Sequence, residues 1–313
     1  MRNKRIFIDG RYGTTGLEIF DRLKDRTDID LLMIPYELRH NETMRRQMLN
    51  EADLVFLCLP DDAAEESVSM IEEDRVVVID TSTRHRTEPG WVYGLMELEG
   101  QKEKIRKAKR IANPGCHATG FITLVQPLVK AGIIRPETAL QCFSLTGYSG
   151  GGKKMMAQYE AEDPDPLLFG PRLYALNQNH KHLKEMKIIS GLDHEPIFCP
   201  IVADYYSGME TVVPLLGSEI QGTMESIKEV YRNTYSSGMI HLCEEDEEGG
   251  YRSAIAYQGR DDLEISVCGN EERILLISRF DNLGKGACGA AIQNMNLVMG
   301  LKETEGLRTG GIQ

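Results

Sequence analysis

A single cysteine lies in a segment that is suited to nucleophilic chemistry. Asn113-Pro114-Gly115 comes just before Cys116, and an apolar, helix-forming run from Phe121 to Val129 follows it. This order predicts a turn and then a helix, with Cys116 at or beside the helix N-terminus. Unpaired backbone N–H groups and the helix dipole stabilise an anion there, which favours the thiolate over the thiol. Cys116 is therefore a candidate nucleophile that forms a thioester.

The other cysteines lack these flanking signals. Free cysteines are usually small buried hydrophobic residues, and we expect that role for six of the seven: Cys58, Cys142, Cys199, Cys243, Cys268 and Cys288. The cysteines are odd in number, lie far apart and include no CxxC pair, so we expect neither a disulfide framework nor a metal site. A reducing cytoplasm is the expected compartment.

A thiolate nucleophile needs an acid/base partner, and the densest histidine cluster offers two candidates. In a helix beginning at Lys181, His182 and Glu185 would stand three residues apart on one face. Glu185 would then orient the imidazole of His182 and support its charged form. His180 is the reserve candidate, although two residues away it is expected to point elsewhere. The alternative is a polar helix start with solvated histidines. His117 adjoins Cys116, but neighbouring helix positions do not face each other.

A glycine-rich segment near the N-terminus predicts a nucleotide site. It follows a predicted strand and opens a predicted helix, a context in which backbone N–H groups contact a pyrophosphate. Its spacing is GxxGxxG, and the alternative is an ordinary glycine-rich turn. The candidate cofactor-binding residues of this segment are Gly10, Tyr12, Gly13, Thr14, Thr15 and Gly16.

The choice between NAD and NADP depends on residues after the second predicted strand. An acidic residue there binds the ribose hydroxyl of NAD, whereas arginine suits the 2′-phosphate of NADP. The chain has both, in Glu37 and Arg39, with Arg11 as a further cation in the glycine loop. Arg39 favours NADP, while a surface pair of Glu37 and Arg39 is the alternative.

Two further polar segments are candidates for cofactor contacts. Ser149 and Gly150 open a run of three glycines before Lys153, where the backbone can closely approach a ligand. Ser82 follows a predicted strand, at the carboxyl edge where ligands bind in open α/β sheets. A flexible loop is the alternative for the glycine run.

The elements that must position these residues differ between the two parts of the chain. Short buried strands alternate with helices in the first part, which predicts a parallel, doubly wound sheet. The strands are expected at 5–9, 31–34, 53–59 and 76–80, and helices at 15–23 and 61–71. After residue 116, longer alternating segments predict a mixed or antiparallel sheet, with strands at 140–146, 210–214, 263–269 and 273–280. Helices are expected at 223–235 and 287–301.

Composition limits the partners of this chain. It has 313 residues and a formal net charge of -12, which argues against a broad nucleic-acid or anionic-membrane surface. No apolar run reaches the roughly 20 residues that span a bilayer. A small molecule is the expected partner, with neither nucleic acid nor membrane.

Taken together, these segments resemble the semialdehyde-dehydrogenase superfamily, and most closely its family of short N-acetyl-γ-glutamyl-phosphate reductases. The resemblance covers nearly the whole chain, and its most specific segments are 113–119 and 285–296. It departs from the family pattern at Lys181, where arginine is usual, and at Lys153 in the serine loop. The cation that binds the substrate's carboxylate or phosphate therefore stays open.

The resemblance implies a Rossmann-type doubly wound parallel sheet plus an α+β catalytic and dimerisation domain. The implied boundaries are 1–115 for the dinucleotide-binding domain, 116–286 for the catalytic domain and 287–313 for a helix that returns to the first. It further implies NADPH as reductant, Asn294 as a cofactor-binding residue, an acyl-phosphate substrate and a homodimer or homotetramer. Cys116 would be the nucleophile and His182, with Glu185, the acid/base.

Two other functions remain compatible with the sequence. One is reduction of a different acyl phosphate, such as aspartyl phosphate or a carrier-bound aminoadipyl phosphate, by the same mechanism. The other is a non-catalytic protein that senses NADP and has an unreactive Cys116.

Overall fold

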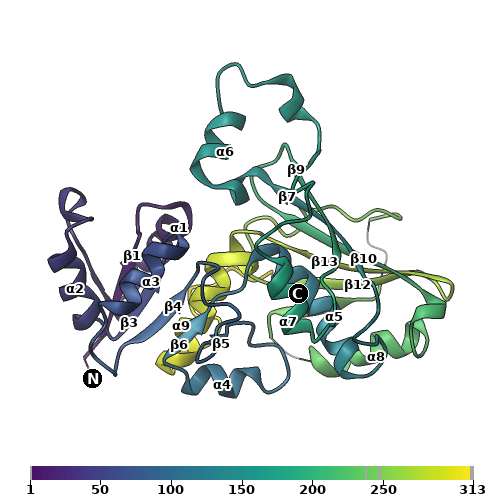
Figure 1. The fold of residues 1–313 in the computed structure, drawn as a ribbon, viewed down its shortest axis with the longest axis horizontal. Coiled ribbons are helices and arrows are strands. Elements are labelled where there is room, and N and C mark those ends of the chain that lie inside the picture. Colours follow the sequence, from purple (N-terminus) through teal and green to yellow (C-terminus); the bar gives the residue numbers. More distant parts are fainter. Residues whose placement is uncertain (1, 237, 246–247, 311–313) are drawn as a thin grey trace. The chain divides into compact units, whose positions relative to one another are not determined.

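The computed structural model describes residues 2–236, 238–245 and 248–310. Spatial contacts divide the chain into two compact units (Figure 1). The first unit contains residues 2–96, 100–114 and 287–307, and the second contains residues 97–99, 308–310 and the described parts of 115–286. These limits lie close to the expected domain boundaries after residues 115 and 286.

A six-stranded, fully parallel sheet forms the centre of the first unit, with strand order β2-β1-β3-β4-β6-β5. The strands are β1 (Lys4–Asp9), β2 (Ile29–Leu32), β3 (Leu54–Leu57), β4 (Val77–Asp80), β5 (Val92–Tyr93) and β6 (Arg110–Ala112). The central strands β3 and β4 are buried along their whole length. Helices on both faces of a parallel sheet produce such continuous apolar strands, so the predicted doubly wound sheet is confirmed.

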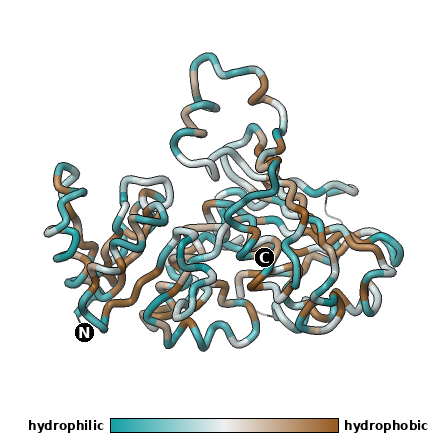
Figure 2. Tube along the Cα trace, in the orientation of Figure 1, coloured by the Kyte–Doolittle hydropathy of each residue, from teal (hydrophilic) through white to brown (hydrophobic). Residues whose placement is uncertain are grey.

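The helices of the first unit cover both faces of this sheet. In β1, Ile6 and Ile8 enter one hydrophobic cluster and Phe7 enters another, because successive side chains of a strand point to opposite faces. Residues of α1, α4 and α9 share the cluster of Ile6, and residues of α2 and α3 share that of Phe7. Figure 2 shows the apolar stretches of this unit along its strands. The helices are α1 (Thr14–Leu23), α2 (Glu42–Glu51), α3 (Asp61–Ser69), α4 (Gln101–Lys107) and α9 (Gly289–Met299).

The second unit contains a seven-stranded mixed sheet, with strand order β11-β12-β13-β10-β7-β9-β8. Strand β7 pairs in parallel with β9, and β11 pairs in parallel with β12. The other neighbouring strands are antiparallel. The strands are β7 (Gln141–Gly147), β8 (Arg172–Leu173), β9 (Ile197–Ala203), β10 (Met209–Leu216), β11 (Ile240–Cys243), β12 (Leu263–Asn270) and β13 (Arg273–Phe280). The predicted mixed sheet is therefore present.

Helix α5 (Cys116–Lys130) packs on the central strands β10 and β13 of this sheet. The helices α7 (Leu183–Ser190) and α8 (Met224–Thr234) pack against α5. Close approach of α5 to the sheet depends on Gly120, since a Cβ atom there would lie 2.4 Å from the Thr211 hydroxyl oxygen. The sheet thus fixes the first turns of α5. Helix α6 (Gly152–Tyr159) lies beyond the ends of β7 and β9 (Figure 1).

Two predicted helices differ from the sequence pattern at their start. The helical segment expected over 287–301 begins earlier, with a π-helical turn at Gly284–Cys288, and continues as α9. The helix expected from Lys181 begins at Leu183, because His182 occupies the capping position. Within the described residues, no helix combines the length and the apolar character needed to cross a membrane.

Candidate active site

Helix α5 begins at Cys116, as the sequence predicts. The capping residue Gly115 has an extended backbone with φ -80° and ψ 146°, so the chain enters the helix from the Asn-Pro-Gly turn. The Cys116 side chain is partly exposed, and those of Cys142 and Cys288 are buried as expected. The other four, those of Cys58, Cys199, Cys243 and Cys268, are also partly exposed, which corrects the expectation that they are buried. Gly286 approaches the Cys116 side chain closely, and a Cβ atom at position 286 would lie 2.9 Å from the Cys116 Cβ atom. Cys116 is thus partly accessible at the N-terminus of α5, where the helix dipole favours a thiolate.

The carboxylate of Glu185 lies at the same end of α5. Glu185 is in the first turn of α7, is almost completely buried, and accepts a hydrogen bond from the Gly115 backbone N–H at 2.8 Å. This contact fixes the residue before Cys116. It also places a carboxylate in the immediate surroundings of the candidate nucleophile.

His180 and His182 lie close together, which corrects the expectation that His180 points elsewhere. Their ring centroids are 4.8 Å apart, and the backbone N–H of His182 donates to Nδ1 of His180 at 3.2 Å. The expectation assumed a helix from Lys181, but both histidines precede α7, where helical spacing does not apply. Since Nδ1 of His180 accepts a hydrogen bond, a neutral His180 carries its proton on Nε2.

Two residues that sequence reasoning did not select join this cluster. The ring of His117 lies 5.6 Å from that of His182 and 5.8 Å from that of His180. Its Nε2 atom is 2.7 Å from the hydroxyl oxygen of Tyr174, which follows β8. His117 joins the cluster because the segment 174–182 packs over the start of α5. No local sequence signal indicates these contacts.

The glycine loop of the first unit has the backbone that a phosphate cradle requires. Gly10 has φ +83°, and a Cβ atom there would lie 2.2 Å from the Cys58 carbonyl oxygen. Gly13 caps α1 and donates to the Gly10 carbonyl, and a Cβ atom at Gly16 would lie 2.4 Å from that same carbonyl. Thr14 and Thr15 open α1, with their backbone N–H groups at its N-terminus. These positions therefore leave backbone, rather than side chains, facing a ligand.

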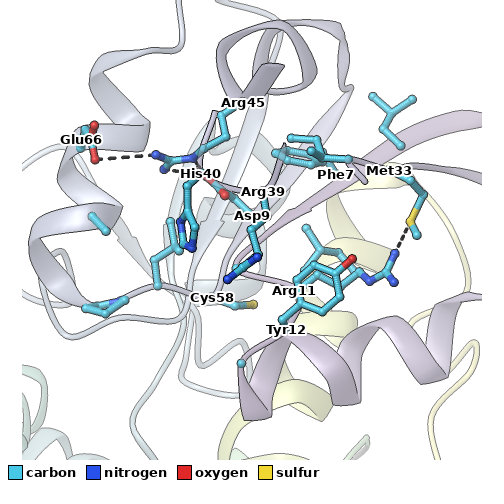
Figure 3. Close-up of a pocket in the computed structure, with 18 residues that line it drawn as sticks. Phe7, Asp9, Arg11, Tyr12, Met33, Arg39, His40, Arg45, Cys58 and Glu66 are labelled. Atoms are coloured by element: carbon cyan, nitrogen blue, oxygen red, sulfur yellow. Dashed lines mark hydrogen bonds and ion pairs between the residues drawn. The ribbon is translucent and has the colours of Figure 1, made fainter. Parts of the chain in front are cut away.

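A cavity of about 500 Å³ adjoins this loop (Figure 3). Tyr12 and Arg39 line this cavity. Glu37 is not among the described residues that line it. Arg39 stacks on the ring of Tyr36 at 3.9 Å and donates to the Tyr36 carbonyl. Arg45 is held by Asp9 and Ser67 in a buried group. Arg11, which contacts Met33, and His40 also line the cavity.

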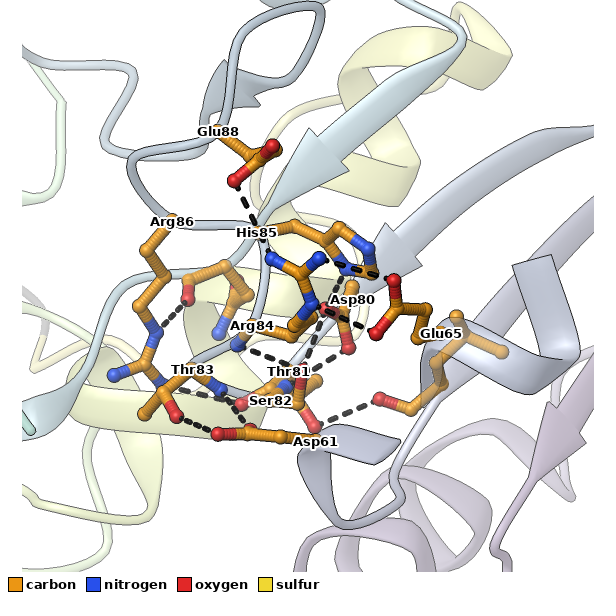
Figure 4. Close-up of polar contacts among 12 residues, drawn as sticks. Asp61, Glu65, Asp80, Thr81, Ser82, Thr83, Arg84, His85, Arg86 and Glu88 are labelled. Atoms are coloured by element: carbon orange, nitrogen blue, oxygen red, sulfur yellow. Dashed lines mark hydrogen bonds and ion pairs between the residues drawn. The ribbon is translucent and has the colours of Figure 1, made fainter. Parts of the chain in front are cut away.

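Ser82 lies in a compact polar loop after β4 (Figure 4). The fully buried Asp80 carboxylate accepts hydrogen bonds from the Ser82 backbone N–H at 2.9 Å and from its hydroxyl at 2.6 Å. His85 places Nδ1 2.6 Å from the same carboxylate and stacks on Trp91. The buried carboxylate therefore fixes the loop at the carboxyl edge of the parallel sheet.

The remaining predicted cofactor residues belong to different units. Ser149 and Gly150 form part of a helical turn after β7 in the second unit, and the Asn282 side chain donates to the buried Ser149 hydroxyl at 3.0 Å. Asn294 is buried in α9 of the first unit and donates to the Gly94 carbonyl at 2.8 Å. Their cofactor roles remain predictions. In the part of the chain that the structure describes, no group of three His, Cys, Asp or Glu residues is arranged to hold a metal ion.

Comparisons with known proteins find relatives of nearly the whole chain. The family model described as "Semialdehyde dehydrogenase, NAD binding domain" matches residues 33–108, and "Semialdehyde dehydrogenase, dimerisation domain" matches residues 116–282. N-acetyl-gamma-glutamyl-phosphate reductases from Brucella ovis and Brucella abortus are each 41% identical over 306 residues, covering 95% of this chain and 99% of the relative. The two matched domains indicate a nicotinamide cofactor and oligomerisation.

Solved structures share the fold. Aspartate semialdehyde dehydrogenase II of Vibrio cholerae, complexed with ASA, has a TM-score of 0.73 at 16% identity, covering 96% of this chain and 99% of that one. The Candida albicans aspartate semialdehyde dehydrogenase with NADP has a TM-score of 0.65 at 13% identity, covering 95% and 99%. At such low identity these likenesses concern the fold alone.

Proposed function

The chain belongs to the N-acetyl-gamma-glutamyl-phosphate reductase family of the semialdehyde dehydrogenases, and we propose that it reduces N-acetyl-γ-glutamyl phosphate to N-acetylglutamate 5-semialdehyde. This reaction serves arginine biosynthesis. The observation that carries the proposal is 41% identity over 95% of this chain and 99% of its relatives. The partly exposed Cys116 at the start of α5 supplies the chemistry that the reaction needs.

Cys116 forms the covalent intermediate. Its thiolate attacks the γ-acyl carbon, the bond from that carbon to the phosphate oxygen breaks, and phosphate leaves with the electron pair, which gives a thioester. Reduced nicotinamide, when bound, supplies the hydride that converts the thioester into a thiohemiacetal. Collapse of the thiohemiacetal breaks the carbon–sulfur bond and returns the Cys116 thiolate. Backbone N–H groups in the first turn of α5 stabilise the oxyanions along this path.

His182 is the proposed acid/base, with His180 as the alternative. His182 takes the proton of the Cys116 thiol, gives it to the oxyanion that hydride transfer leaves on the thioester carbon, and takes it back as the thiohemiacetal collapses. Glu185, which is fixed at Gly115, supports the resulting imidazolium. General acid/base catalysis of this kind contributes about 10²–10⁴ in rate.

NADP is the proposed cofactor. Any side chain at Gly10 or Gly16 would collide with backbone atoms. The loop therefore carries no side chain at these positions, and its backbone can approach a pyrophosphate. Arg39, on the lining of the adjoining cavity, would hold the 2′-phosphate, and Tyr12 would line the same site. Ser82, Ser149, Gly150 and Asn294 are the further residues we propose to contact the cofactor.

We also propose a homodimer or homotetramer in the cytoplasm. The matched dimerisation domain supports association of the second unit. Among the described residues no cysteine forms a disulfide bond, which fits a reducing compartment.

The decisive experiment runs the reaction backwards and avoids the unstable acyl phosphate. Reduction of NADP by N-acetylglutamate semialdehyde is measured with and without phosphate, for the wild type and for Cys116→Ser. We expect phosphate-dependent activity that the substitution abolishes. Aspartate semialdehyde serves as the comparison substrate. Activity with aspartate semialdehyde and none with N-acetylglutamate semialdehyde would show that aspartyl phosphate is the substrate. NADP binding without turnover of either aldehyde would indicate a non-catalytic sensor.

A further inference from the structure

A chain of polar contacts leads from the surface of the candidate site into the sheet of the second unit. It begins at Tyr174, whose hydroxyl oxygen lies 2.7 Å from Nε2 of His117. Nδ1 of His117 lies 2.7 Å from the Ser144 hydroxyl oxygen, and that oxygen lies 3.0 Å from the Thr211 hydroxyl. Ser144 and Thr211 are register partners on β7 and β10 and are both fully buried. Both ring nitrogens of His117 are therefore held in place.

Burial, together with the nearby His180 and Lys181, lowers the pKa of His117 to about 3. The ring is therefore neutral near neutral pH. A neutral imidazole donates from one nitrogen and accepts at the other. We infer that His117 is protonated on Nε2, so that it accepts from Ser144 and donates to the Tyr174 oxygen; in the opposite tautomer the Tyr174 hydroxyl would donate to His117. With His117 protonated on Nε2, the Tyr174 O–H is directed at an acceptor other than His117.

The Tyr174 hydroxyl lies among the groups to which chemistry is assigned. Its ring is 6.0 Å from that of His180, and its partner His117 directly follows Cys116 in the first turn of α5. Burial raises the pKa of Tyr174, and the negative charge of a Cys116 thiolate raises it further. The phenol therefore keeps its proton at working pH and can act only as a hydrogen-bond donor or a neutral acceptor.

We propose that the Tyr174 hydroxyl is a further catalytic group, which donates a hydrogen bond to the acyl oxygen of the substrate, and that His117 is its positioning residue. The inference rests on the proposed reaction at Cys116. When the thiolate attacks, the carbonyl electron pair moves onto this oxygen, and the Tyr174 O–H stabilises the negative charge without transferring its proton. The carbonyl re-forms as phosphate leaves. A preorganised donor contributes most where charge develops.

The first test compares Tyr174→Phe with Tyr159→Phe. The two tyrosines belong to the same hydrophobic cluster, and the Tyr159 hydroxyl contacts Arg172, so the second substitution removes a hydroxyl from the same surroundings. We expect Tyr174→Phe to lower kcat/KM by roughly 10²-fold, whereas Tyr159→Phe keeps wild-type activity. The rate of Cys116 alkylation by iodoacetamide should stay unchanged in Tyr174→Phe, because the hydroxyl acts on the substrate oxygen and not on the thiolate.

The second test asks whether His117 acts through Tyr174. His117→Gln retains an amide that can donate to the Tyr174 oxygen, and His117→Leu does not. Alone, His117→Leu should lower kcat/KM by a factor similar to that of Tyr174→Phe, and His117→Gln by less. When either His117 substitution is combined with Tyr174→Phe, kcat/KM should not fall further, because the effects of residues that act through one another are not additive. If His117→Leu does not fold, the cycle with His117→Gln decides.

The outcomes separate this inference from the proposed function. A wild type that does not turn over N-acetylglutamate semialdehyde overturns the proposed function and this inference with it. An active wild type in which Tyr174→Phe equals Tyr159→Phe overturns the role of Tyr174 alone. A Tyr174→Phe variant with slowed alkylation of Cys116 shows a structural effect on the nucleophile instead. Additive losses in the double variant overturn the positioning role of His117.

Discussion

The carboxylate of Glu185 accepts a hydrogen bond from the backbone N–H of Gly115 at 2.8 Å. The two residues are 70 positions apart in sequence, and Gly115 is the capping residue of the helix that begins at Cys116. A buried carboxylate that is tied to this cap has two separate effects. The hydrogen bond fixes the backbone before Cys116, and in the proposed mechanism the carboxylate supports a positive imidazole on His182.

Substitution of Glu185 should separate these two effects. Glu185→Gln keeps an oxygen that can accept from Gly115 but loses the charge, and Glu185→Ala loses both. Because an unmade hydrogen bond to a buried group costs about 1–3 kcal/mol, Glu185→Ala should lower the free energy of unfolding by about that amount and Glu185→Gln by less. Both should lower kcat/KM by roughly 10²-fold, within the range for acid/base support.

Urea unfolding and steady-state rates of the two variants check this prediction. The exposed Glu195→Gln on the loop after α7 is the control and should change neither quantity. If Glu185→Gln retains wild-type activity, the charge has no part in the reaction, and Glu185 serves only to hold Gly115.

Nucleotide preference should depend on Arg39. A hydrogen bond to a charged group contributes about 1.5–3 kcal/mol, so Arg39→Ala should raise the KM for NADP by roughly 10- to 150-fold. The KM for NAD, which lacks the 2′-phosphate, should not change. Arg46→Ala is the matched control, since Arg46 forms exposed ion pairs with Glu42 and Glu72. Equal effects of Arg39→Ala on both nucleotides would remove Arg39 from phosphate recognition.

The fold could be predicted from the sequence wherever one strand or helix determines its own pattern. The central strand β3 is buried on both faces, and its apolar run is visible in the sequence. The expectation for β2 was less accurate, because its apolar run at 31–34 is displaced by two residues from the strand Ile29–Leu32. β2 is at the edge of the sheet and pairs only with β1. Its position is therefore set by register with β1, which no local pattern reveals.

The candidate site could likewise be predicted only where its residues lie close together in the sequence. Cys116 directly begins its helix, and His180 and His182 are only two positions apart in sequence, although the expectation was that His180 points elsewhere. The contacts of His117 with Ser144 and Tyr174 join positions 27 and 57 residues apart. They form because β7, the segment after β8 and the start of α5 meet in the tertiary structure. Such tertiary contacts depend on the order of the strands in the sheet, which cannot be read from composition or residue spacing.

Gly10 should be irreplaceable for steric rather than conformational reasons. Gly10 and Gly90 have similar left-handed backbones, with φ +83° and +87°, but a Cβ atom at Gly90 meets no atom within 4 Å. Gly90→Ala should therefore cost only the left-handed backbone term of about 1–2 kcal/mol. Gly10→Ala must also displace the Cys58 carbonyl, so it should cost more and abolish NADP binding. Urea unfolding and NADP titration measure both effects, and equal costs would contradict the cradle.

Glu210 should make the stability of the protein depend on pH. It lies on β10, paired in register with Arg279 of β13. Burial, partly offset by Arg279 and Arg252 and reinforced by Glu248, raises its pKa to about 7. Between its ordinary pKa of 4.5 and 7, the folded protein holds a proton on Glu210 that the unfolded chain has lost. Stability contributed by this group is therefore greatest at low pH and decreases as the pH rises through that window.

Glu210→Gln removes this titration, because the amide is neutral at every pH. At pH 8 it should raise the free energy of unfolding by roughly 1 kcal/mol, a value reduced from full linkage since the side chain retains some exposure to solvent. At pH 5 the wild-type carboxyl is itself protonated when folded, so the difference between the two proteins should be smaller. Urea unfolding at both pH values, with the exposed Glu219→Gln as control, measures the change. A gain in Glu210→Gln that is equal at pH 5 and pH 8 would show that the carboxyl does not titrate in this window, and that contacts with Arg279 and Arg252 hold it charged.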